Sequence, residues 1–153
     1  MKLLLVEDTK RKSDRIETFL NEAYTERGIE IIKKESYHSA CKEIFDHGDE
    51  YFVILLDMTM STFDATNGEN GGEPEPVAGK RILNGMYLRE IMTKVIVVTM
   101  HNVFGSQKLL SLIEELKELF PDNYYDYIFF AFNSEDWKKK LKADIDNLLN
   151  IPQ

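Results

Sequence analysis

Residues 53–56 are four consecutive apolar residues, Val-Ile-Leu-Leu, and an aspartate, Asp57, follows them directly. An uninterrupted apolar run of this length is typical of a strand that is buried on both faces, as in the middle of a parallel sheet. In open parallel α/β sheets, ligands bind at the carboxyl edge of the strands. The pattern therefore predicts a central strand that ends in a carboxylate placed for chemistry.

A second apolar run, near the start of the chain, ends in the same way. Residues 3–6 lead directly into Glu7 and Asp8. If the two strands are neighbours, these acids converge with Asp57 at one edge, and three carboxylates that close do not all stay ionised without a cation. A hard divalent ion that prefers oxygen ligands, above all Mg²⁺, suits such a site. The plainer interpretation is that the acids only end two strands at a solvated edge.

Apolar runs and amphipathic segments alternate along the rest of the chain, which implies a parallel sheet with helices on both faces. Further strands are expected at residues 29–35, 94–99 and 127–132. The spacing of apolar residues predicts helices at about 9–28, 36–46, 80–92, 106–120 and 134–149.

Residues 61–79 interrupt this alternation. Within them, residues 67–76 read NGENGGEPEP, without apolar content or periodicity. Loops longer than about 15 residues in compact domains are usually functional or disordered. The sequence therefore predicts a single domain, residues 1–153, with a long, acidic and flexible insertion at about 61–79.

Composition limits the classes of partner. The formal net charge is -8 and the sequence pI is near 4.9, which argues against broad affinity for nucleic acid or anionic membranes. The single cysteine, Cys41, has no partner for an internal disulfide. The sequence has neither a signal peptide nor an apolar run that could span a bilayer, so we expect a cytoplasmic protein whose partners are proteins or small ions.

The motifs at the strand ends resemble those of the receiver domains of bacterial two-component response regulators. They are Val-Glu-Asp at 6–8, Leu-Leu-Asp-Met at 55–58 and Val-Val-Thr at 97–99. The resemblance runs from Leu3 to about Leu149. It implies a flavodoxin-like five-stranded parallel sheet of order 2-1-3-4-5, with helices on both faces, and a signalling domain rather than an enzyme.

The resemblance also implies roles for individual residues at the acidic edge. Asp57 matches the phosphoacceptor, which takes a phosphoryl group from a phosphohistidine or a small acyl phosphate. Glu7 and Asp8 match the acids that hold Mg²⁺ together with Asp57 and the backbone carbonyl of Thr59. A metal that bridges carboxylate and phosphoryl oxygens neutralises charge that would otherwise repel the incoming group.

Two further positions match the switch residues of the family. Thr99 matches the hydroxyl that moves toward the phosphoryl group, and Tyr127 matches the aromatic residue of the fifth strand. Each also has a plainer interpretation. Thr99 is then a strand-end hydroxyl bonded by backbone, and Tyr127 is ordinary core beside other aromatic residues.

The sequence departs from the family in its fifth-strand segment. Family members carry a lysine three residues after the switch aromatic, where this chain has Phe130, and residues 127–136 contain no lysine or arginine. The cation that pairs with the phosphate is therefore missing from this segment. Lys80 and Arg81, at the far end of the insertion, are candidates to fold back over the site.

Three hypotheses about function follow. The first is a stand-alone receiver phosphorylated on Asp57, whose partners are a histidine kinase or phosphotransfer protein and a downstream protein. It involves no nucleic acid or membrane, and the face of the fourth strand, fifth strand and last helix allows a homodimer. The second is a pseudo-receiver, a binding module that is not phosphorylated. The third is a Mg²⁺-dependent phosphohydrolase, ranked last because Thr59 stands where haloacid-dehalogenase-type phosphatases carry a second acid.

Overall fold

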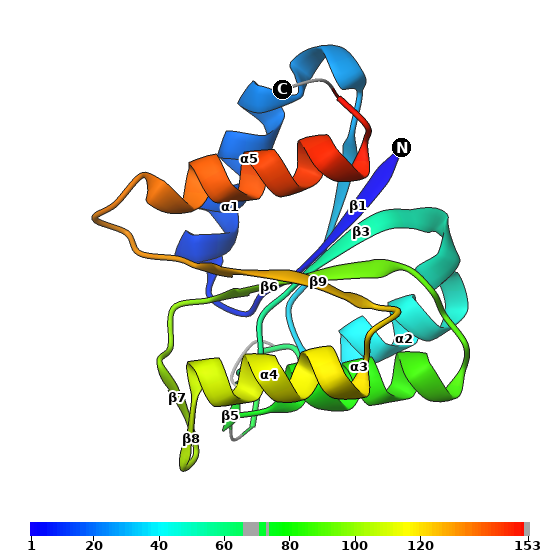
Figure 1. Ribbon diagram of the computed structural model, residues 1–153, viewed down its shortest axis with the longest axis vertical. Coiled ribbons are helices and arrows are strands. Elements are labelled where there is room, and N and C mark those ends of the chain that lie inside the picture. The colour runs from blue at the N-terminus through cyan, green and yellow to red at the C-terminus, as the bar shows by residue number, and fades with distance from the viewer. Residues whose placement is uncertain (66–70, 73, 152–153) are drawn as a thin grey trace.

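The structure, a computed structural model, describes residues 1–65, 71–72 and 74–151. At its centre lies a five-stranded sheet in which every neighbouring pair is parallel (Figure 1). Taken in chain order, its strands lie in the order 2-1-3-4-5, as predicted. Across the sheet they are β2 (Glu30–Lys34), β1 (Lys2–Val6), β3 (Tyr51–Leu56), β6 (Lys94–Thr99) and β9 (Tyr124–Phe129).

Helices cover both faces of this sheet, which confirms the predicted architecture. Figure 1 shows α1 and α5 on one face and α2, α3 and α4 on the other. Within the described residues, none of the helices combines the length and apolar character that a bilayer-spanning segment requires. The helices are α1 (Lys10–Ala23), α2 (Tyr37–His47), α3 (Ala78–Leu88), α4 (Leu109–Leu119) and α5 (Asp136–Leu148).

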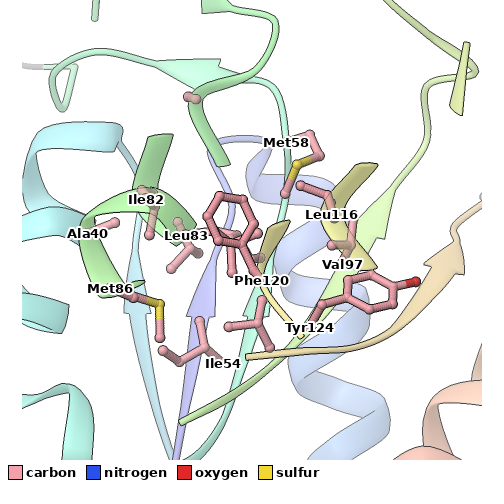
Figure 2. Close-up of a cluster of buried hydrophobic side chains, with 14 of the residues drawn as sticks. Ala40, Ile54, Met58, Ile82, Leu83, Met86, Val97, Leu116, Phe120 and Tyr124 are labelled. Atoms are coloured by element: carbon pink, nitrogen blue, oxygen red, sulfur yellow. The ribbon is translucent and has the colours of Figure 1, made fainter. Parts of the chain in front are cut away.

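Successive side chains of each strand point to opposite faces of the sheet, which divides the apolar core into two layers. In β3, Ile54 and Leu56 pack on the side of α2, α3 and α4, whereas Val53 and Leu55 pack on the side of α1 and α5. Figure 2 shows the first layer, where Ile54 lies among side chains from the covering helices. Because both faces are covered, the strand is apolar at every position, and only its end carries a polar residue.

Several elements differ from the sequence prediction in their bounds, among them the fifth strand and the third helix. The fifth strand of the sheet, β9, is formed by Tyr124–Phe129 rather than by residues 127–132. Helix α3 begins at Ala78, before the predicted start at Lys80, and ends at Leu88. In both cases the run of apolar residues extends beyond the element, so hydrophobicity alone does not set its ends.

Two short antiparallel pairs accompany the main sheet. One joins β7 (Val103–Phe104) to β8 (Gln107–Lys108) through Gly105, whose φ of 63° favours glycine, in a segment that the sequence assigned to a helix start. The other joins β4 (Met60–Ser61) to β5 (Pro74–Glu75). The second pair closes the two ends of the predicted insertion, of which residues 66–70 and 73 lie outside the described residues.

Asp144, on α5, is a buried carboxyl beside β9, and its Oδ2 has no hydrogen-bond partner among the described residues. Burial, together with the neighbouring Asp126, raises its pKa to about 7. A carboxyl whose pKa is raised in the folded state stabilises the fold below its unfolded pKa, and this contribution is lost as pH rises through the folded pKa. We expect Asp144→Asn to be more stable than the wild type by about 1 kcal/mol near pH 8 and equal to it near pH 4, after allowance for solvent screening.

Urea denaturation at the two pH values measures this difference. Asp46→Asn, at an exposed position of α2, is the control and should change stability equally little at both. A stability gain of Asp144→Asn that is the same at both pH values would contradict the explanation.

Candidate functional site

Three carboxylates meet at the carboxyl edge of the sheet, as the sequence predicts. Glu7 and Asp8 follow β1, Asp57 follows β3, and one oxygen atom from each lies within 4.8 Å of the others. Val6 is paired with Leu56, so the residues that follow them emerge side by side. Three hard oxygen donors at this spacing fit a divalent ion such as Mg²⁺.

Asp57 is 3% exposed, and both of its carboxylate oxygens have partners. Oδ1 accepts a hydrogen bond of 2.7 Å from the backbone N–H of Met58 and a longer one of 3.5 Å from that of Thr59. Oδ2 lies 3.2 Å from Nζ of Lys12. The carboxylate is therefore held in one orientation, with a positive charge beside it.

Lys12, on α1, is 0% exposed and places an ammonium group inside the acidic cluster. Besides Asp57, its Nζ contacts Oε2 of Glu7 at 2.5 Å and donates to the backbone carbonyl of Val98 at 2.8 Å. These three oxygens match the three N–H donors of an ammonium group. A buried lysine is stable only with such partners, so the contacts account for its position.

Glu7 is buried more deeply than a metal-binding acid on a solvated edge would be. It is 3% exposed, its Oε1 accepts a hydrogen bond from the backbone N–H of Thr9, and its Oε2 faces Lys12. Burial raises its pKa to about 8, because desolvation and the charge of Asp57 outweigh the ammonium of Lys12. A divalent cation bound beside Glu7 would favour its carboxylate form.

Asp8 is the most accessible of the three acids. Its Oδ2 accepts hydrogen bonds from the backbone N–H and the hydroxyl of Ser61, at 3.0 and 3.4 Å. Ser61 belongs to β4, at the start of the insertion. Asp8 thus connects the acidic cluster directly to the segment that interrupts the alternation of strands and helices.

The two predicted switch residues lie on the neighbouring strands β6 and β9. Thr99 is fully buried at the end of β6, and its hydroxyl accepts a hydrogen bond of 3.1 Å from the backbone N–H of His101. Tyr127 is paired with Val97, two positions before Thr99, and the Nζ of Lys140 lies 4.0 Å from the centre of its ring. Tyr127 also lines a cavity of about 530 Å³ between α4 and β9.

Lys80 and Arg81 pair with residues outside the acidic cluster. Lys80 pairs with Glu115 of α4. Arg81 pairs with Glu75 of β5 at 2.7 Å and stacks on the ring of Tyr37. The proposal that either one folds back over the site is therefore not supported, and Lys12 provides the positive charge instead.

Sequence reasoning missed Lys12, although the chain carries a signal for it. Lys12, Ile16 and Leu20 are spaced four residues apart and lie on one face of α1, and all three are buried. A lysine at an apolar position of a helix that starts beside two strand-end acids indicates a buried ion pair. The family carries its lysine on the fifth strand, so the family pattern gives no signal at Lys12.

Comparison with known proteins decides the family. The chain is 31% identical to the Detocs response regulatory protein DtcB of Enterobacter cloacae (strain JD6301) over 153 residues, which cover 97% of this chain and 100% of the relative. The chain belongs to the response-regulator receiver family. No family model matches the receiver's sequence, so this assignment depends on the relative and on the fold.

Solved structures agree with this assignment at the level of the fold. The receiver matches a response regulator receiver domain from Clostridium thermocellum with a TM-score of 0.66 and 19% identity, over 97% of this chain and 94% of the other. It also matches a chain of the complex between the P1 domain of CheA3 and CheY6 from R. sphaeroides, with a TM-score of 0.61 and 15% identity, over 97% and 96% of the two chains.

Proposed function

We propose that this receiver accepts a phosphoryl group on Asp57 in a Mg²⁺-dependent reaction and signals by protein–protein contact. The observation that carries the proposal is the grouping of Asp57 with Glu7, Asp8 and the ammonium of Lys12 at the carboxyl edge of the sheet. This arrangement gives a nucleophilic carboxylate, acids for a metal ion and a fixed positive charge. All three are what phosphoryl transfer requires of a protein.

In the proposed reaction, a carboxylate oxygen of Asp57 forms a bond to the phosphorus of a phosphohistidine or a small acyl phosphate. The bond from phosphorus to the donor's nitrogen or acyl oxygen breaks, and its electron pair leaves with the donor. The backbone N–H of Met58 holds Oδ1 of Asp57 in place, so the carboxylate is oriented before the donor arrives.

Glu7, Asp8, Asp57 and the backbone carbonyl of Thr59 would hold the Mg²⁺ ion. When bound, the ion neutralises charge on the phosphoryl oxygens. The fit is supported by the 4.8 Å grouping of the three carboxylates, which are hard oxygen donors. The hydrogen bond from Ser61 to Asp8 orients the most accessible of these ligands.

The signal would leave the site through the face formed by β6, β9 and α5. In this proposal Thr99 is the switch hydroxyl and Tyr127 is the switch aromatic, beside the face of β6, β9 and α5 through which a homodimer or a downstream protein would bind. A histidine kinase or phosphotransfer protein would supply the phosphoryl group, in the cytoplasm. The matched complex of a CheA3 P1 domain with CheY6 supports a donor of this kind.

We also propose that residues 1–153 act as one domain with an acidic insertion, predicted at about 61–79, of which residues 66–70 and 73 lie outside the described residues. The β4 and β5 pair joins Met60–Ser61 to Pro74–Glu75, and Ser61 connects this segment to Asp8. Through that contact the insertion would respond to occupation of the metal site.

The test is incubation of the protein with acetyl phosphate, with and without Mg²⁺, followed by intact mass measurement. We expect the wild type to gain one phosphoryl group only with Mg²⁺, and Asp57→Asn to gain none. Asp122→Asn, an exposed aspartate, is the control and should be labelled like the wild type. Absence of label on the wild type with Mg²⁺ would refute the proposal.

The pseudo-receiver is a second candidate, favoured by one specific observation. The ammonium of Lys12 already balances charge between Glu7 and Asp57 without a metal or a phosphoryl group. If the protein is only a binding module, Asp57→Asn should leave partner binding unchanged. If phosphorylation regulates it, the same variant should lose the phosphorylation-dependent change in binding.

A further inference from the structure

The position of Lys12 indicates a specific role in the proposed reaction. Its ammonium is fully buried and lies between Oε2 of Glu7, at 2.5 Å, and Oδ2 of Asp57, at 3.2 Å. The bond of 2.8 Å to the carbonyl of Val98 fixes it to the adjacent strand β6. The charge therefore stays beside Asp57 even if one carboxylate turns to another partner.

At the carboxyl end of β9, the residue that lies near Lys12 is the buried, apolar Phe130. The backbone N–H of Phe130 donates to the carbonyl of Thr99 at 2.8 Å, which places Phe130 next to the end of β6. Its ring packs against Trp137 and Phe132, with ring centres 4.8 and 5.0 Å apart, and lies 5.9 Å from Nζ of Lys12. The ring thus fills the side of the site from which a β9 side chain would enter, and the ammonium comes from α1.

We propose that Lys12 is the phosphoryl-pairing cation of this receiver and that its ammonium competes with the divalent ion for Glu7 and Asp57. The inference depends on the proposed phosphorylation of Asp57. A phosphoryl group carries about -1.5 to -2 charges near neutral pH, and a charged donor already within hydrogen-bond distance of the acceptor pairs with it without further reorganisation. Among the described residues, Lys12 is the cation that the structure places in contact with Asp57.

The Lys12 ammonium and the divalent ion should compete because both are positively charged. The ammonium contacts the same two buried carboxylates that the metal would use, and two cations near one another repel. Removal of the ammonium should therefore leave the acids more available to Mg²⁺. If Lys12 only supported the fold, its removal should weaken Mg²⁺ binding, because loss of a structural contact would loosen the acids.

The experiment compares Lys12→Met and Lys12→Gln with the wild type. Lys10→Met, an exposed lysine on the same helix, is the matched control. Titration calorimetry measures Mg²⁺ binding, and intact mass measures the rate of labelling by acetyl phosphate. We expect both Lys12 variants to bind Mg²⁺ several-fold more tightly and to be labelled about 100-fold more slowly, whereas the control matches the wild type in both.

The outcomes separate this inference from the proposed function. No labelling of the wild type refutes the proposed function, and this inference fails with it. Equal labelling of the wild type and the Lys12 variants leaves the function intact and overturns the inference, and weaker Mg²⁺ binding by the variants overturns the competition.

If neither variant folds, the wild type itself provides the test. The ammonium ¹⁵N resonance of Lys12 is then followed by NMR as beryllofluoride, which mimics the phosphoryl group, is added with Mg²⁺. We expect this resonance to shift on complex formation. A Lys12 resonance that stays unchanged while that of the Asp57 backbone amide moves would overturn the inference.

Discussion

Replacement of Lys12 by methionine is expected to lower the free energy of unfolding of the metal-free protein by about 3 to 5 kcal/mol. Methionine fills much of the same space, so the loss is mainly electrostatic. Glu7 and Asp57, each 3% exposed, would remain buried next to each other without their counter-ion. Removal of one partner from a buried charge cluster costs far more than loss of a surface ion pair.

Urea denaturation followed by circular dichroism measures this effect. The deficit of Lys12→Met should shrink when Mg²⁺ is added, because a bound cation stabilises the folded state and replaces the missing charge. The double variant Asp57→Asn, Lys12→Met should be less destabilised than Lys12→Met alone, since a buried carboxylate that would lack its counter-ion is gone. Equal midpoints for the wild type and Lys12→Met without metal would show that the buried cluster does not need the ammonium.

Replacement of Gly79 by alanine is expected to destabilise the protein by about 2 to 3 kcal/mol. Gly79 lies in the first turn of α3, and its N–H donates to the carbonyl of Met58 at 3.0 Å. A Cβ there would lie 2.6 Å from the carbonyl oxygen of Asp57 and 3.0 Å from Cα of Met58. These are backbone atoms, so either the helix or the loop that carries Asp57 must move.

Gly85→Ala is the matched control on the same helix. A Cβ at Gly85 would lie 2.5 Å from Cζ of Phe45, the far end of a half-buried ring that can rotate away. Alanine also favours helix by about 1 kcal/mol over glycine, which offsets part of that cost. Thermal melts should therefore show a clear loss for Gly79→Ala and a small one for Gly85→Ala, and the first variant should also bind Mg²⁺ more weakly. Equal losses would contradict the account.

The sequence by itself determined the sheet and the grouping of its acids. Apolar runs that end in Glu7, Asp8 and Asp57 predict buried parallel strands, and parallel strands bring their carboxyl ends to one edge. The positions of these strand-end acids follow from the local sequence pattern together with the parallel topology. The covering of both faces by helices follows from the alternation of apolar runs and amphipathic segments, whereas the strand order was implied by the resemblance to receiver domains.

The register of β9 is different, because it depends on contacts between distant segments. Residues 124–130 are aromatic or apolar at most positions, so the sequence offers no alternation that marks where pairing begins. The pairing with β6, which includes an irregularity between Val95 and Ile96, places the strand at Tyr124–Phe129. Only the partner strand decides such a register.

The positive charge of the site was likewise decided by the tertiary structure. A lysine in an amphipathic helix is normally solvated, and the sequence does not show how far the buried face of α1 extends. In the fold, that face places Lys12 between Glu7 and Asp57, while Phe130 occupies the end of β9 with an aromatic ring. Chain order fixes which residues end a strand, but the side chain that neutralises them is selected by packing in three dimensions.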